Sequence, residues 1–173
     1  MHPFHQRDPG VIGLLGASDT TRPFYGIICD GVHVHPHSVM IAYRAHPDGA
    51  CLVTDAMAAQ SLPNGVYKLG EMDVDVHDGN VYIQGTNTIA GAVITLAECV
   101  RNFARFTGAS KVEALESATL HPAQMLGITH RKGVLAHGAD ADIIVLDHEL
   151  NVQRIFVAGR EATRENVSYK NKL

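Results

Sequence analysis

The sequence predicts an α/β protein whose N-terminal part is the end of a larger parallel barrel. Two short runs, FYGIIC (24–29) and ACLVT (50–54), are apolar on both faces, as is typical of buried parallel strands. The segment between them has a helical rhythm, so together they predict a strand, a crossover helix and a second strand. One such unit cannot cover both faces of its sheet, and a complete (β/α)₈ barrel needs on the order of 250 residues. The 173 residues present therefore predict part of a barrel.

Three histidines, His33, His35 and His37, stand at alternate positions just after the first predicted strand. Pro36 is expected to open the crossover helix and Gly49 to close it. Since strand side chains alternate between faces, the three rings would share a face only while the strand lasts, and Pro36 is expected to end it. The spacing alone leaves three alternatives open: a metal site, a catalytic histidine with two bystanders, or histidines in a polar loop.

The pattern then changes from continuous to alternating. Residues 65–85 alternate apolar and polar side chains around Asp78-Gly79, which predicts a β-hairpin. TIAG (88–91) is interpreted as a small-residue turn, or as a place where a ligand approaches exposed backbone. Residues 93–106 carry a broad apolar face and predict a helix.

A second helix is predicted over 110–120, because Ser110 and Glu113 form the pattern of a capping box. Residues 132–162 again indicate strands joined by glycine turns. The last residues, 166–173, predict a frayed end.

Composition excludes several classes of protein. With 46% apolar and 18% charged residues the chain is no disordered tail, and a net charge of −4 provides no basic surface for nucleic acid. No apolar run approaches the ~20 residues of a membrane span, and the N-terminus has no secretory h-region. Cys29, Cys51 and Cys99 form no CxxC pair, which argues against a disulfide framework or a thiolate zinc site and favours a reducing cytoplasm.

Polar residues follow both predicted parallel strands. Asp30 and His33 come after the first strand and Asp55 after the second, and active sites of parallel α/β folds gather at such strand ends. The apolar setting of Asp55, LVTDAM, suits a tuned or oriented carboxylate, whereas the alternative is a helix N-cap. For His33 the alternative is a structural histidine. Arg7 either clamps an anion such as phosphate or forms a surface ion pair with Asp8.

Six stretches occur in a characteristic order: HQRDPG (5–10), GIICDGVHVHP (26–36), LVTDAM (52–57), GTNTIAG (85–91), ATLHPAQMLGI (118–128) and KGVLAHGADADIIVLD (132–147). They cover nearly the whole chain and resemble the C-terminal half of the N-acetylglucosamine-6-phosphate deacetylase family, in the amidohydrolase superfamily. The last two stretches are shared by many amidohydrolases. The combination of DGVHVHP with LVTDAM is far more specific to these deacetylases.

The resemblance implies an α/β fold made of the C-terminal portion of a (β/α)₈ barrel and part of a small β-sandwich. The strands that end at Asp30 and Asp55 would be the last two of the barrel. Residues 1–131 would belong to the barrel, with a hairpin insertion around 65–85, and 132–165 would form strands of the sandwich. The implied reaction is the hydrolysis of N-acetylglucosamine 6-phosphate to glucosamine 6-phosphate and acetate.

The matching stretches also imply roles for individual residues. Asp55 would be the catalytic general base and acid. The substrate-binding residues would be Arg7, Asp30, Gly31, Val32, His33, Ile89, Ala90 and Gly91. Among them, His33 would be the main polar contact, and Arg7 would bind the phosphate across a homodimer interface. His35 and His37 would be bystanders.

The resemblance further implies a divalent metal, Zn²⁺. Its ligands, a Glu and two His, would lie upstream of the position that matches Met1, so we expect no metal ligand in this chain and expect the chain to be a fragment. One alternative is another amidohydrolase, dihydroorotase-like or aminoacylase-like, which would share Asp55 and have no need of Arg7. The other is a non-catalytic fragment or interaction module.

Overall fold

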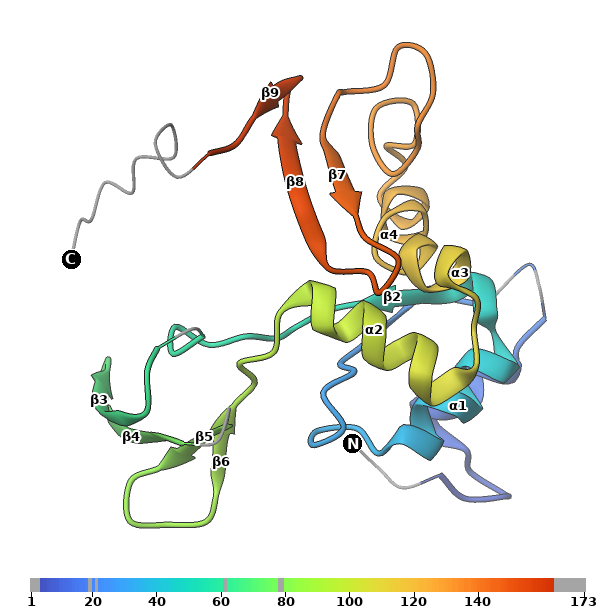
Figure 1. Ribbon diagram of the computed structural model, residues 1–173. Coiled ribbons are helices and arrows are strands. Elements are labelled where there is room, and N and C mark those ends of the chain that lie inside the picture. The colour runs from blue at the N-terminus through green and yellow to red at the C-terminus, as the bar shows by residue number, and fades with distance from the viewer. Residues whose placement is uncertain (1–3, 19, 21, 61, 78–79, 164–173) are drawn as a thin grey trace.

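The computed structural model describes residues 4–18, 20, 22–60, 62–77 and 80–163. Its strands form a parallel pair, a four-stranded antiparallel sheet and a three-stranded antiparallel sheet, which lie in different parts of the molecule (Figure 1). The strands are β1 (Tyr25–Ile27), β2 (Ala50–Leu52), β3 (Gly65–Leu69), β4 (Met72–His77), β5 (Asn80–Ile83), β6 (Ile89–Gly91), β7 (Ile143–Leu146), β8 (Val152–Val157) and β9 (Arg160–Glu161). The α-helices are α1 (Pro36–Ala45), α2 (Leu96–Thr107), α3 (Lys111–Glu116) and α4 (Leu120–Met125), and the 3₁₀ helices are η1 (Gly10–Gly16) and η2 (Pro47–Gly49). The predicted mixed α/β class is confirmed.

The parallel pair confirms the predicted strand–helix–strand unit. β1 and β2 run parallel, with Ile27 opposite Leu52 at the end of the pairing, and α1 crosses between them. These elements and α2 bury one apolar cluster, in which Phe103 of α2 is fully enclosed. The ring of Phe103 meets that of Tyr43 on α1 edge to face, with 5.3 Å between the centroids. The main core therefore lies between the parallel pair and its helices.

α1 begins where it is predicted to begin and ends earlier. Pro36 is its first residue, where the fixed φ suits the helix and no intrahelical hydrogen bond is lost. The prediction that Gly49 closes this helix is wrong, because α1 ends at Ala45. The residue before a proline is disfavoured in the helical conformation, so His46 cannot continue the helix into Pro47. Gly49 belongs to η2 instead.

Capping boxes fix the starts of the next two helices. In α3 the predicted box is confirmed, with Ser110 and Glu113 each accepting the backbone N–H of the other. α2 begins at Leu96 rather than at residue 93, because Thr95 and Glu98 form a second capping box. α3 is also shorter than predicted, and a separate helix, α4, follows it.

The predicted hairpin is present within a larger sheet. β4 pairs with β5, and His77 opposite Asn80 closes the pairing, while the turn residues Asp78 and Gly79 lie outside the described residues. β3 and β6 extend the sheet on either side. The prediction of a turn over 88–91 is wrong, since β6 forms there. Its small residues have little strand propensity, and the pairing with β5 decides their conformation.

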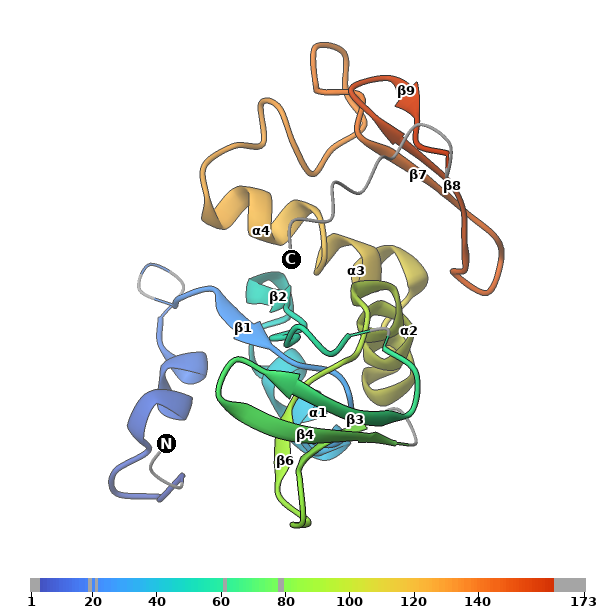
Figure 2. The ribbon, with the colours of Figure 1, turned by 90° about the vertical axis from the view of Figure 1, so that its left-hand side faces the viewer.

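β7, β8 and β9 confirm the strands predicted within 132–162. Ile144 and Val145 are neighbours on β7 and point to opposite faces, yet they are 47% and 41% exposed. Both faces of this sheet are therefore open, and Figures 1 and 2 show it apart from β3–β6. The frayed end predicted at 166–173 lies outside the described residues. Within the described ranges, no helix combines the length and apolar character needed to cross a membrane.

Candidate functional site

The two parallel strands end level with one another. Their last paired residues are Ile27 and Leu52, and the N–H of Val53 donates to the carbonyl of Ile27 over 3.1 Å. Asp30 follows Ile27 by three residues, and Asp55 follows Leu52 by three. Because the strands are parallel and in register, Asp30 and Asp55 leave the same edge of the pair.

Asp30 is held in a tight turn with His33. Its Oδ1 accepts the backbone N–H groups of Val32 and His33, each over 2.9 Å, and its Oδ2 lies 2.6 Å from Nδ1 of the His33 ring. Burial by itself raises the pKa of Asp30. Hydrogen bonds from the His33 ring and from the two backbone N–H groups outweigh burial and hold the pKa below its usual value. The Asp30 carboxylate is therefore ionised at neutral pH.

The same turn depends on Gly31 and on a contact from α2. Gly31 has φ +78°, in the left-handed region that strains residues with a Cβ. A Cβ there would lie 3.4 Å from Cζ of Phe106, so α2 runs close to the turn. From the same helix, Nδ2 of Asn102 donates to the carbonyl of Cys29 over 2.8 Å. α2 thus fixes the turn relative to the core.

The other two histidines of the cluster make local contacts. Nδ1 of His35 accepts the backbone N–H of His37 over 3.2 Å, so His35 is the N-cap of α1. The His35 and His37 rings meet edge to face, with 4.9 Å between their centroids. Of the three rings, that of His33 is paired with a carboxylate among the described residues. The contacts therefore separate His33 from its two neighbours.

Asp55 has a different environment. Its backbone is left-handed, with φ +48°, and its exposed carboxylate makes no hydrogen bond or ion pair with another described residue. No helix begins there: Ala56 forms a β-bridge with Ala92, and the next helix along the described chain is α2, which starts at Leu96. The alternative interpretation of Asp55 as an N-cap is therefore wrong, and its carboxylate is available to a molecule outside the chain.

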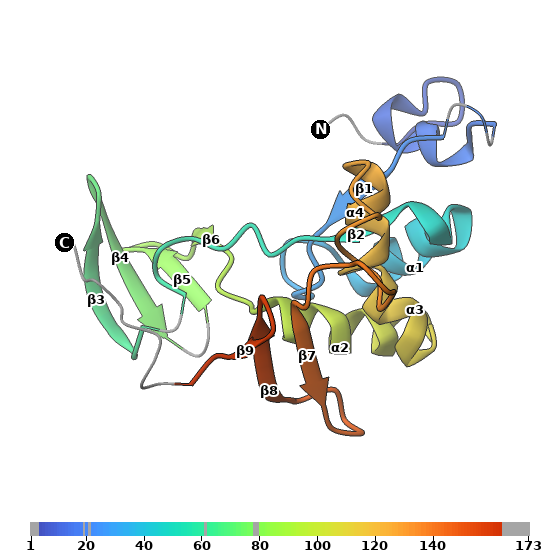
Figure 3. The ribbon, with the colours of Figure 1, turned by 90° about the horizontal axis from the view of Figure 1, so that it is seen from above.

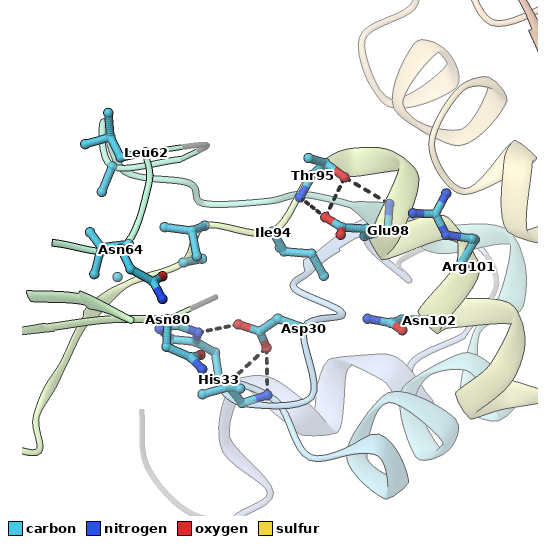
Figure 4. A pocket seen from close by; sticks show the side chains of 16 residues that line it. Asp30, His33, Leu62, Asn64, Asn80, Ile94, Thr95, Glu98, Arg101 and Asn102 are labelled. Carbon is cyan, nitrogen blue, oxygen red and sulfur yellow. Dashed lines mark hydrogen bonds and ion pairs between the residues drawn. The ribbon is translucent and has the colours of Figure 1, made fainter. Parts of the chain in front are cut away.

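A cavity of about 460 Å³ opens beside the turn after β1, between the four-stranded sheet and the start of α2 (Figure 4). The predicted site residues that line it are Asp30, Val32, His33 and Gly91. Asp55, Ile89 and Ala90 are outside the lining. The bridge from Ala56 to Ala92 nevertheless joins the segment of Asp55 to the cavity wall.

Sequence analysis missed part of this lining. The further polar lining residues are Asn64, Asn80, Thr95, Glu98, Arg101 and Asn102. Figure 4 shows the hydrogen bonds between Thr95 and Glu98 that form their capping box. The Thr-x-x-Glu pattern is a readable signal for these two residues. In contrast, no local pattern indicates that Asn64, in the loop before β3, and Asn80, in β5, border the same cavity as Asp30.

Arg7 lies away from the cavity. Its segment is the blue stretch that Figures 1 and 3 show on the side away from β3–β6. The backbone N–H of Arg7 donates to Nδ1 of His5 over 3.2 Å. Its exposed guanidinium forms no ion pair with Asp8 or with any other described residue, so the surface-pair alternative is not supported. Arg7 is not among the residues that line the cavity beside Asp30.

The described residues do not fit a complete metal site. Among them, no three or more His, Cys, Asp or Glu side chains are grouped so as to hold a metal ion. The three cysteines are buried and unpaired, and burial raises the pKa of the Cys29 thiol to about 12. A buried thiol of this kind stays protonated and is a poor metal ligand.

Comparison with known proteins finds similarity along most of the chain. A profile described as "Amidohydrolase family" matches residues 1–162. An N-acetylglucosamine-6-phosphate deacetylase of Danio rerio is 49% identical over 169 residues, which are 95% of this chain and 42% of that protein. The chain thus spans less than half the length of this relative.

Two solved structures share the fold. An N-acetylglucosamine-6-phosphate deacetylase from Thermotoga maritima superposes with a TM-score of 0.81 at 32% identity, covering 92% of this chain and 43% of that one. A mutant deacetylase from Mycobacterium smegmatis in complex with N-acetyl-D-glucosamine-6-phosphate superposes with a TM-score of 0.80 at 36% identity, covering 93% and 42%. At these identities the likeness extends to sequence as well as to fold.

Proposed function

Because the chain belongs to the amidohydrolase family, we propose that it supplies the sugar-phosphate-binding and proton-transfer part of an N-acetylglucosamine-6-phosphate deacetylase. The reaction adds water across the acetamide C–N bond and yields glucosamine 6-phosphate and acetate. The names of the relatives and the sugar-phosphate complex of one neighbour support this substrate. The observation that carries the proposal is the level ending of β1 and β2, which brings Asp30, His33 and Asp55 to one edge.

Asp55 acts as general base and then as general acid. The water oxygen attacks the acetamide carbonyl carbon while the Asp55 carboxylate takes the water's proton. The C–N bond then breaks, and Asp55 returns the proton to the leaving amine nitrogen. An exposed carboxylate that makes no hydrogen bond or ion pair with another described residue, held by a left-handed backbone at a strand end, supports this role.

The cavity binds the amino sugar. His33 offers the main polar contact from the turn that also contains Asp30, Gly31 and Val32. Ile89, Ala90 and Gly91 of β6 also contact the sugar, and of these three Gly91 lines the cavity. Val32 and His33 line the cavity, as does Gly91 at the end of β6, and these placements support the proposal. Small side chains at 90 and 91 let a ligand approach the backbone closely.

Arg7 binds the phosphate of the substrate held by a second copy of the chain, in a homodimer. Its guanidinium is exposed and forms no ion pair with a described residue, which supports a role as an anion clamp. Arg7 is also outside the cavity lining of its own chain, which supports a role across an interface. Guanidinium groups bind phosphate in bidentate fashion.

The wider architecture of the proposal follows the relatives. β1 and β2 are the last two strands of a (β/α)₈ barrel to which residues 1–131 belong, with an insertion around 65–85, and 132–165 supply strands of a small β-sandwich. The superposition on two deacetylases supports this assignment. The open faces of β7 and β8 also suit strands that pack against a second sheet.

A divalent metal, Zn²⁺ in our proposal, belongs to the deacetylase as a whole. We propose that its ligands, a Glu and two His, belong to another part of the enzyme; the described residues contain no group of three or more side chains suited to hold a metal ion. We also propose a cytoplasmic location, which the three unpaired, buried cysteines support.

The proposal is tested by measuring acetate release from N-acetylglucosamine 6-phosphate by the natural protein that carries this chain. We expect turnover with this substrate and a far lower kcat/KM for unphosphorylated N-acetylglucosamine. Equal kcat/KM for the two sugars would contradict the phosphate site. Turnover of dihydroorotate or of an N-acetyl amino acid in place of the sugar phosphate would favour another amidohydrolase, and inactivity on all of these substrates would favour a non-catalytic module.

A further inference from the structure

Asp30 is a poor candidate for direct contact with substrate. Both of its oxygens already accept hydrogen bonds, and its side chain is only 11% exposed. The side chain of His33 is 31% exposed and lines the cavity, and its Nε2 has no partner among the described residues. Of the pair, His33 is therefore the residue that can meet a ligand.

The contact between Asp30 and His33 also fixes where the ring carries its proton. An ionised carboxylate is an acceptor only, so the hydrogen between Oδ2 of Asp30 and Nδ1 of His33 belongs to the ring. In a neutral imidazole one nitrogen donates and the other accepts. Nε2 of His33 is therefore the nitrogen with the free lone pair.

We propose, on the basis of the function proposed above, that Asp30 is a positioning residue that holds His33 in its Nδ1–H tautomer, so that Nε2 accepts a hydrogen bond from a donor group of the amino sugar. Such a donor is a hydroxyl group or the amide N–H. A fully ionised phosphate has no hydrogen to donate, so the lone pair also disfavours the phosphate at this end of the cavity. Asp30 acts through His33 and does not contact the substrate itself.

The substitution Asp30→Asn tests this role because the turn dictates how the new amide is oriented. The amide oxygen must stay where Oδ1 is, since two backbone N–H groups donate there. The amide NH₂ then faces Nδ1 of His33, which has to become the acceptor. The ring proton moves to Nε2, and the lone pair in the cavity is lost while the turn and the side-chain volume are kept.

The direct readout is the ring tautomer, measured by NMR on the natural protein that carries this chain, labelled with ¹⁵N-histidine. Correlations between ring nitrogens and ring hydrogens distinguish the two tautomers, and the His33→Gln variant identifies the His33 signals. Spectra are recorded over a range of pH, and the tautomer is read where the His33 ring is neutral. We expect the Nδ1–H tautomer in the unaltered chain and the Nε2–H tautomer in Asp30→Asn. An Nε2–H tautomer in the unaltered chain overturns the proposal without any variant.

The kinetic readout uses the natural protein that carries this chain. Because Nε2 contributes to binding, Asp30→Asn should raise KM for N-acetylglucosamine 6-phosphate roughly tenfold and change kcat much less. Asp147→Asn is the matched control. Asp147 sits in the turn between β7 and β8, where its Oδ1 likewise accepts two backbone N–H groups and its Oδ2 accepts side-chain donors. This control should leave both KM and the His33 tautomer unchanged.

The outcomes separate this inference from the proposed function. A switched tautomer with unchanged KM shows that Nε2 does not meet the substrate and overturns the inference, while turnover of the sugar phosphate still supports the function. An unswitched tautomer in Asp30→Asn overturns the positioning role. Absence of turnover by the unaltered natural protein would count against the function, and the sugar contact proposed for Nε2 would fall with it.

Discussion

The turns that follow β1 and β2 are level with one another, yet they treat their aspartates in opposite ways. Asp30 is enclosed by three hydrogen bonds from its own turn, whereas Asp55 makes none with a described residue. A carboxylate whose oxygens are all occupied can orient a neighbour but has little freedom to exchange a proton with a ligand. One without partners can do so. The comparison therefore supports the proposed division of roles, in which the first turn positions His33 and the second transfers the proton.

The largest effect should come from Asp55→Asn, which removes the free carboxylate of the second turn. The amide keeps the volume of the carboxylate but cannot accept the proton of the attacking water. In the natural protein that carries this chain, kcat should fall by roughly 10²–10⁴-fold, with KM largely kept. The acidic limb of the kcat/KM–pH profile should also change or vanish. A variant that keeps more than about a tenth of the kcat would remove Asp55 from the mechanism.

Arg7→Ala tests whether a third region, the N-terminal segment, contributes to the site beside the two turns. If Arg7 clamps the phosphate, its loss should raise KM for the phosphorylated sugar roughly 10- to 100-fold, because a charge-assisted hydrogen bond is lost from ground and transition states alike. The unphosphorylated sugar should be unaffected. Mixing Arg7→Ala with Asp55→Asn protein adds a test of the interface: mixed dimers should regain a site with both residues, and activity above the sum of the two variants indicates that Arg7 acts across subunits.

The sequence predicts where the two aspartates lie along the strands but does not predict the contacts that distinguish them. Two apolar runs, each followed by an aspartate, predict that Asp30 and Asp55 follow neighbouring parallel strands at the same end, and the register confirms that these strands end level. The interior of each turn was not predictable, since no local pattern shows that a histidine three residues on would bond to Asp30 or that Asp55 would precede no helix. Long-range packing decided the rest: small residues became β6, and Asn102 of α2 anchored the first turn.

A matched pair of glycine substitutions tests whether the conformation of the Asp30 turn matters for substrate binding. Gly31 has φ +78° in the Asp30 turn, and Gly70 has φ +63° between β3 and β4, with open space around it. Replacement by alanine strains a left-handed backbone, so both Gly31→Ala and Gly70→Ala should lower the free energy of unfolding by roughly 1–2 kcal/mol. Urea denaturation of the 173-residue chain measures this loss. Only Gly31→Ala should also raise KM in the natural protein, and equal KM effects would show that the Asp30 turn does not shape the site.

The smallest expected effect is on the acid stability of the first turn. Hydrogen bonds lower the pKa of Asp30 in the folded chain below that of an unfolded aspartate, about 3.9. The stability that this group contributes is thus fully present above the unfolded pKa and is lost as pH falls through the folded pKa. The pKa values of other carboxylates, including those of Asp140, Asp147 and Glu161, are also lowered, so Asp30 accounts for one part of the acid sensitivity. Urea unfolding between pH 2 and pH 6 (roughly the range that brackets these carboxyl pKa values) should show a shallower loss of stability on acidification for Asp30→Asn than for the unaltered chain. The same slope in both would mean that the hydrogen bonds around Asp30 do not favour its ionised form, and the fixed tautomer of His33 would then lose its physical basis.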